Sequence, residues 1–333
     1  MFHHGLLALA ASLLSIPIAS AIPWNATEYI FVFGDSYTSD GYNISAGIDS
    51  PEPGYTSSNG PNWVEFLTST YNQTAVKTFN LAYGGATIDG ALVPPYLPTV
   101  LSVVDQVSEF NEYLASKPAG AQWDSTNSLF AIWIGINDVG NSVGWVGVFH
   151  GHRWEASDVS TLGQTNITQF EFYGTLMDRL FSQVHDLYNA GARNFLFLTV
   201  PPTNRAPLFL EQGPQAADQM GTDIANYNTQ LTQSVRSFRA NYTDLGSVTV
   251  FDTQPIFNTL LDEWQTFGFV NVTGYCAAYE NGTPTRTYQV EGCAPVSSYF
   301  WLNTLHPLFT VHNVLAKAIS TALADYPATQ IPT

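Results

Sequence analysis

Short apolar runs alternate with longer amphipathic stretches along most of the chain. Five short runs predict strands, and the clearest have no polar residue at alternate positions, which indicates burial on both faces. These runs are Tyr29–Phe33, Val76–Asn80, Leu129–Ile134, Asn194–Val200 and Val248–Asp252. Amphipathic stretches predict helices at Trp63–Tyr71, Val100–Leu114, Gln169–Asn189, Ala216–Ala240, Ile256–Phe267 and Thr310–Ala324. Helical crossovers favour parallel pairing, so the pattern predicts a three-layer α/β/α sandwich around a five-stranded parallel sheet.

The beginning of the chain has a different pattern. Leu6 to Ile18 is an uncharged apolar run, followed by Ala19-Ser20-Ala21. This run is too short to span a membrane, and small residues at alternate positions after it are typical of signal-peptidase sites. We therefore expect a signal peptide over residues 1–21 and one domain over residues 22–333, with no membrane span.

Two long stretches do not fit the alternation of strands and helices. Val139–Thr165 and Asn271–Phe300 are rich in glycine and aromatic residues and predict long loops. Loops of this length inside a compact domain are usually functional.

Two further features agree with export. In an oxidising compartment, Cys276 and Cys293 are expected to form a disulfide that closes a polar loop, two free buried thiols being the alternative. Several Asn-x-Ser/Thr sequences predict N-linked glycans on surface loops. Their asparagines are Asn25, Asn43, Asn72, Asn166, Asn241, Asn271 and Asn281.

Composition narrows the class of protein. The chain has 333 residues, with 10 Lys and Arg against 27 Asp and Glu, so its formal net charge is −17. Charged residues make up 11% of it and aromatic residues 14%, which excludes a disordered acidic protein. Ten scattered basic residues provide no face for binding phosphate backbones, which excludes a nucleic-acid partner. The uncharged polar surface fits an extracellular protein.

The predicted strand ends carry chemistry that fits acyl transfer. Ligands of open parallel sheets bind at the carboxyl ends of the strands. There the first three strands run into Ser36, into Gly85 and into Asn137. Together they would provide a hydroxyl beside N–H donors that can stabilise an oxyanion. His306, just before the last helix, can supply the base.

These residues resemble the four conserved blocks of the GDSL (SGNH) hydrolase family, in the same order and spacing. Gly34-Asp35-Ser36-Tyr37 is similar to the first block, and Asn80 with Gly85 to the second. Gly135-x-Asn137-Asp138 is similar to the third, and His306 to the base of the last. Within the family, the segments 83–87 and 301–307 are most like those of fungal secreted acetylesterases of carbohydrate esterase family 16.

The resemblance implies a flavodoxin-like fold and a serine esterase that needs no metal or organic cofactor. Ser36 would be the nucleophile and His306 the base, while Ser36 N–H, Gly85 N–H and Asn137 would form the oxyanion hole. One residue departs from the family pattern, because position 303 is Asn where the last block normally has Asp. Asn303 is predicted to orient His306 through its carbonyl oxygen, without supplying charge.

Other residues offer weaker alternatives. Gly140-Asn141-Ser142-Val143-Gly144 matches the nucleophile-elbow pattern G-x-S-x-G, but Ser142 lies in a predicted Gly-rich loop and not at a strand-to-helix turn. His150 and His152 lack a third metal ligand at a useful spacing. His312 is assigned to packing or to a minor role as base.

The substrate follows mainly from the resemblance. We expect a monomer that removes acetyl groups from partly acetylated oligosaccharides such as xylo-oligosaccharides. Exposed Trp145, Trp154 and Trp301 are predicted to stack on the sugar rings. A GDSL lipase or phospholipase acting on lipid esters is the alternative enzyme. A paired-carboxylate glycosidase and a non-catalytic glycan-binding protein rank lower.

Overall fold

The computed structural model describes residue 22 and residues 24–143 and 168–325. Its sheet has five parallel strands in the order β2-β1-β3-β4-β5, which confirms the predicted fold class. The strands are β1 Tyr29–Gly34, β2 Lys77–Asn80, β3 Ser128–Trp133, β4 Phe195–Leu198 and β5 Val248–Phe251. Each lies within a few residues of its predicted position. The predicted signal peptide lies outside the described residues, as do Trp145, Trp154, Asn166, His150 and His152.

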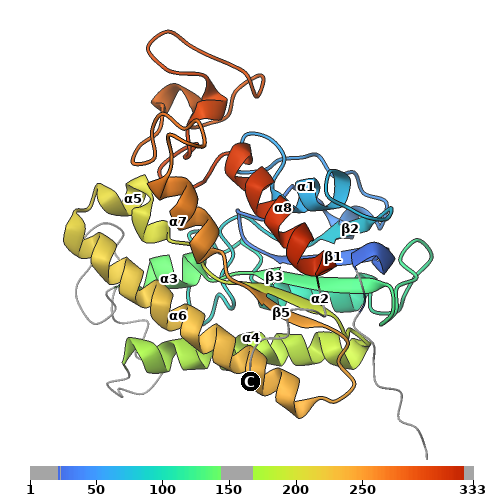
Figure 1. The fold of residues 1–333 in the computed structure, drawn as a ribbon. Helices are drawn as coiled ribbons and strands as arrows, with labels where there is room; N and C mark the ends of the chain where they lie inside the picture. The colour runs from blue at the N-terminus through green and yellow to red at the C-terminus, as the bar shows by residue number, and fades with distance from the viewer. Residues whose placement is uncertain (1–21, 23, 144–167, 326–333) are drawn as a thin grey trace, which may run out of the picture.

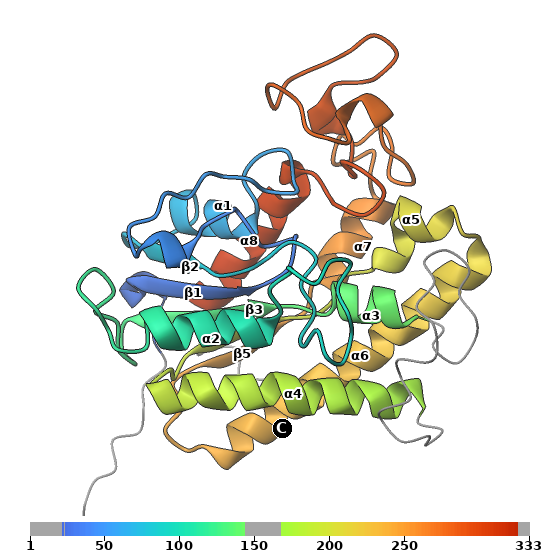
Figure 2. The ribbon, with the colours of Figure 1, turned by 180° about the vertical axis from the view of Figure 1, so that it is seen from behind.

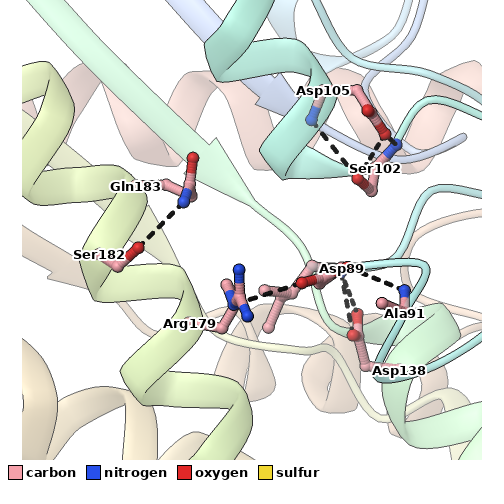
Figure 3. Close-up of polar contacts among 9 residues, drawn as sticks. Asp89, Ala91, Ser102, Asp105, Asp138, Arg179, Ser182 and Gln183 are labelled. Carbon is pink, nitrogen blue, oxygen red and sulfur yellow. Dashed lines mark hydrogen bonds and ion pairs between the residues drawn. The ribbon is translucent and has the colours of Figure 1, made fainter.

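Helices pack on both faces of this sheet (Figures 1 and 2). Helices α1 and α8 pack together on one face, whereas α2 packs on β1 and α4, and α4 packs on α6. The helices that the sequence predicts are α1 Trp63–Ser69, α2 Val103–Tyr113, α4 Gln169–Ala190, α6 Pro214–Asn241, α7 Gln254–Asp262 and α8 Phe309–Ala324. Capping boxes begin α1, α2 and α4, and Figure 3 shows the one formed by Ser102 and Asp105.

Aromatic packing holds β1 between its two neighbours, β2 and β3. Phe31 is fully buried and stacks on Phe79 of β2 and Phe130 of β3, with ring centroids 5.3 and 4.8 Å away. Phe110 of α2 meets the Phe31 ring edge-on at 5.2 Å. These contacts fix the relative positions of the first three strands, whose carboxyl ends carry the chemistry.

Two short helices were missed by the sequence prediction. Helix α3 covers Ile136–Ser142 and begins directly after β3, and α5 covers Pro207–Leu210. The prediction of a loop from Val139 onward is therefore wrong as far as Ser142. The segment of α3 is rich in Asn, Asp and Gly, which favour turns when nothing else intervenes. Tertiary packing prevails here, since Val139 is fully buried.

The segment between α7 and α8 projects from the layered body (Figures 1 and 2). It contains only the short 3₁₀ turns Ala277–Tyr279 and Val296–Ser298 and is closed by a disulfide between Cys276 and Cys293. Asn59 exchanges two hydrogen bonds of 2.8 Å with Thr283 and so ties this segment to the loop before α1. The predicted long loop and disulfide are both present.

None of the described helices has the length and apolar character needed to cross a membrane.

Candidate active site

The hydroxyl of Ser36 is presented by a tight turn at the carboxyl end of β1. The carbonyl of Asp35 accepts the N–H groups of Thr38 and Ser39, and its Oδ1 accepts the N–H of Tyr37 at 3.0 Å. Asp35 is buried, whereas Ser36 is partly exposed. Burial raises the pKa of Asp35 to about 7. Asp35 supports the turn by accepting hydrogen bonds from backbone amides.

The His306 ring reaches Ser36 from the loop that precedes α8. Its Nε2 lies 2.7 Å from Ser36 Oγ, and its Nδ1 lies 3.0 Å from Asn303 Oδ1. The loop is closed by a hydrogen bond from Leu302 N–H to the carbonyl of His306. The structure therefore brings together Ser36, His306 and Asn303, which the sequence analysis grouped.

The backbone fixes the orientation of the Asn303 amide. Asn303 Oδ1 accepts the N–H of Leu305 at 3.0 Å and that of His306 at 2.9 Å. Two N–H donors require an oxygen and not the NH₂ group at that position. An amide oxygen can only accept, so His306 Nδ1 must carry the proton that faces it. Nε2 is then the unprotonated nitrogen and can accept the proton of Ser36.

The same geometry leaves His306 without a charged partner. In the described part of the chain, no carboxylate is hydrogen-bonded to its ring. Burial therefore acts unopposed and lowers the pKa of His306 to about 4. The imidazole is neutral, and so able to act as a base, over a range that extends well into acid.

Gly85 and Asn137 lie at the ends of the neighbouring strands and supply N–H donors. Gly85 has a φ of 82°, a left-handed conformation that favours glycine. Asn137 sits in the first turn of α3, where its Nδ2 donates one proton to the carbonyl of Ala86 at 2.8 Å. Among the described residues, nothing accepts the N–H of Ser36 or Gly85. Donors without a partner beside a hydroxyl suit a developing oxyanion.

Tyr37 is a functional candidate that the sequence analysis did not single out. Its hydroxyl donates to the carbonyl of Leu305 at 2.6 Å, and its ring lies 5.6 Å from the His306 ring. The residue after Ser36 therefore holds the loop that carries His306. The His312 ring lies 6.1 Å from the Tyr37 ring, and His312 is 2% exposed. This burial agrees with a packing role for His312.

The residue after Asn137, Asp138, carries a second buried carboxyl. Both oxygens of Asp138 face the N–H of Ile88, at 3.0 and 3.3 Å. Burial raises the pKa of Asp138 to about 7. Asp138 thereby joins α3 to the segment that follows Gly85.

Two expectations need correction or restriction. Trp301 is 1% exposed and its Nε1 donates to the carbonyl of Val272 at 2.8 Å, so the prediction that it stacks on substrate is wrong. Ser142 is fully buried at the end of α3, not in a loop, and accepts a hydrogen bond from Gln169 at 3.0 Å. Burial removes Ser142 as a nucleophile.

Within residues 22, 24–143 and 168–325, no group of three His, Cys, Asp or Glu side chains is placed to hold a metal ion.

Comparison of the sequence with known proteins shows the family to which the chain belongs. The model of the GDSL-like lipase/acylhydrolase family matches residues 30–319. The chain is 36% identical to an acetylesterase of Thermothelomyces thermophilus over 309 residues, which cover 89% of this chain and 88% of the relative. It is 23% identical to an acetylesterase of Hypocrea jecorina, again over 89% and 88% of the two chains.

A solved acetyl-xylooligosaccharide esterase from Geobacillus is 16% identical, with a TM-score of 0.45 over 92% of this chain and 95% of that one.

The match over residues 30–319 and the 36% identity to an acetylesterase support hydrolysis of acetyl esters. The chain belongs to the GDSL-like lipase/acylhydrolase family and is a carboxylic ester hydrolase.

Proposed function

We propose that the protein is a secreted serine esterase that removes acetyl groups from partly acetylated oligosaccharides through an acyl-enzyme on Ser36. The observation that carries this proposal is the continuous hydrogen-bond chain from Ser36 Oγ to His306 and from His306 to Asn303, at 2.7 and 3.0 Å. Among the described residues, the N–H groups of Ser36 and Gly85 have no acceptor, so both are free to bind an oxyanion.

Acylation begins with Ser36. Its Oγ attacks the acetyl carbonyl while His306 Nε2 takes the hydroxyl proton. The negative charge on the carbonyl oxygen is stabilised by Ser36 N–H, Gly85 N–H and the second Nδ2 proton of Asn137. The imidazolium then gives its proton to the sugar oxygen, and the bond between that oxygen and the acetyl carbon breaks.

Deacylation repeats these steps with water. His306 Nε2 takes a proton from a water molecule, whose oxygen attacks the acetyl-Ser36 carbonyl. The same donors stabilise the second oxyanion. Ser36 regains its proton from His306 as acetate leaves. Neither half of the reaction needs a metal or an organic cofactor.

Several observations support secretion. The Cys276–Cys293 disulfide fits an oxidising compartment. Four asparagines of the predicted glycosylation sequences, Asn25, Asn43, Asn241 and Asn281, are exposed. The acetyl group follows the names of the acetylesterases to which the chain is similar. The oligosaccharide rests on the resemblance of segments 83–87 and 301–307 to carbohydrate esterases.

A substrate panel tests the proposed function. We expect the purified protein to hydrolyse aryl acetate faster than aryl butyrate or octanoate, and to release acetate from acetylated xylo-oligosaccharides but not fatty acid from phospholipid. Rates that rise with acyl length to octanoate would replace the acetylesterase by a lipase. The Ser36→Ala variant controls for contaminating esterases in every arm.

The pH profile tests the role of the uncharged residue at position 303. In the wild type, kcat/KM for aryl acetate is expected to fall only as the pH drops through about 4, where His306 becomes protonated. Asn303→Asp keeps the shape of the side chain but places a negative charge beside His306 Nδ1. This charge raises the pKa of His306, so the acid limb should move about 1–3 pH units higher. Asn303→Ala removes the orienting acceptor, and kcat should fall about tenfold to hundredfold.

Full pH profiles of the wild type and both variants check these expectations. An Asn303→Asp profile that overlays the wild type would show that position 303 does not set the His306 pKa. A kcat of Asn303→Ala within about threefold of the wild type would remove the orienting role.

A further inference from the structure

An exposed aromatic ring lies directly against Gly85. A Cβ atom placed on Gly85 would meet Tyr96 Cε1 at 2.2 Å and Cδ1 at 2.7 Å, so the Tyr96 ring covers the side of Gly85 where a side chain would stand. The Tyr96 side chain is nevertheless 67% exposed. One part of the Tyr96 ring thus lies against Gly85, and the rest of the ring faces solvent.

The loop that carries Tyr96 is anchored to the body of the protein ahead of the ring. Asp89 forms an ion pair with Arg179 of α4 at 3.2 Å and accepts the N–H of Ala91 at 2.8 Å (Figure 3). Thr87 Oγ1 donates to the carbonyl of Val93 at 2.8 Å, and Val93 itself is fully buried.

Three prolines around Tyr96 restrict the loop further. Tyr96 is preceded by Pro94-Pro95 and followed by Leu97-Pro98, and each proline ring fixes its own φ. Val100 N–H closes this stretch by donating to the carbonyl of Leu97. The backbone that carries the ring is therefore restricted, so less conformational entropy is lost when a ligand stacks on it.

From this geometry we infer that Tyr96 is a specificity-determining residue that stacks on the sugar ring bearing the acetyl ester. The inference rests on the proposed function and names the part of the substrate that the ring contacts. In the tetrahedral intermediate the oxyanion points at Gly85 N–H, so the groups next to the reacting carbon pass close to Tyr96. An acetyl group ends in a single methyl and cannot cover an aromatic ring. The alcohol half, a pyranose, presents a flat C–H face of the size that stacks on tyrosine.

Tyr96→Ala tests this contact on two acetate esters. For acetylated xylo-oligosaccharide we expect kcat/KM to fall about threefold to tenfold, mainly through KM, because an aromatic contact of this kind is lost. For ethyl acetate, which has no ring, the fall should be much smaller. Tyr96→Phe keeps the ring and should behave like the wild type on both esters. Tyr113→Ala is the matched control, because Tyr113 is a partly exposed tyrosine at the last residue of α2 and has no described contact with Gly85.

Each other outcome has a distinct meaning. Equal losses on the two esters would show that Tyr96 only shapes the Gly85 segment, and no loss on either would remove the contact altogether. A loss confined to aryl octanoate would place the ring against the acyl chain. Each of these results overturns the inference. A wild type that cleaves ethyl acetate but no sugar acetate would overturn the proposed substrate class itself.

Discussion

Replacing Ser36 with alanine is expected to reduce kcat on aryl acetate by about five to six orders of magnitude, with the fold and unfolding temperature unchanged. The hydroxyl lies 2.7 Å from His306 Nε2, and no described side chain could take over its attack from the same position. Ser36 is partly exposed and Ser36 Oγ supports no other described contact, so its loss leaves the packing intact.

Two further variants make this result specific. His306→Ala and the Ser36→Ala/His306→Ala double variant should each lose about as much as Ser36→Ala alone, because residues that act as a unit are not additive. Ser142→Ala is the matched control, a buried serine that also lies near the carboxyl edge of the sheet. Its kcat should stay within about twofold of the wild type. A large loss in Ser142→Ala, with Ser36→Ala active, would contradict the assignment.

Asn137→Ala is expected to reduce kcat by about 10² to 10³, with a much smaller change in KM. The side chain is oriented by its hydrogen bond to the carbonyl of Ala86, and we propose that its remaining proton binds charge that develops only in the transition state. An interaction of that kind lowers kcat when it is removed.

Asn137→Asp separates donation from shape. The carboxylate fits the same space but offers no proton and repels the oxyanion, so its kcat should be at least as low as that of Asn137→Ala. Asn127→Ala, just before the amino end of β3, is the matched control and should keep full activity. If Asn137→Asp retains most of the activity, the third donor of the oxyanion hole lies elsewhere.

The sheet was predictable because its strands carry a strong local signal. The residues of β1 and β3 are almost all apolar. Strand β1 ends at Gly34 and β3 ends shortly before Gly135, so the limits of both strands are visible in the sequence. Helix α3 was not predictable, since Asn, Asp and Gly favour turns and only the packing of Val139 and its neighbours in the folded chain stabilises it.

The candidate site was predictable where function requires a particular residue type. Ser36, Gly85 and Asn137 follow strand ends and His306 precedes the last helix, in a recognisable order. The substrate contacts were not predictable, because the number of aromatic residues in a sequence does not show which of their rings face solvent. Trp301 is buried and bonded to a backbone carbonyl, whereas Tyr96 is exposed beside Gly85. The only sequence signal for Tyr96 was a proline-rich stretch soon after the second family block.

Asn303 shows how a departure from the family pattern can keep its function. The sequence showed the loss of a charge, but not that backbone N–H groups of the same loop would fix the orientation of the amide. With no charge at position 303 to oppose it, burial lowers the pKa of His306 to about 4, so the base stays neutral in mild acid. No pattern of residue types contains that information, because it depends on the geometry of the turn.

The central claim is that Ser36 carries the acetyl group during turnover. Rapid acid quenching of the enzyme with aryl acetate, followed by mass spectrometry of its peptides, tests this most directly. The account predicts that one acetyl group appears on the peptide containing Ser36, accumulates in the first turnover and is absent in Ser36→Ala. An acetyl group on another residue, or full turnover with no covalent adduct in conditions that preserve serine esters, would contradict it.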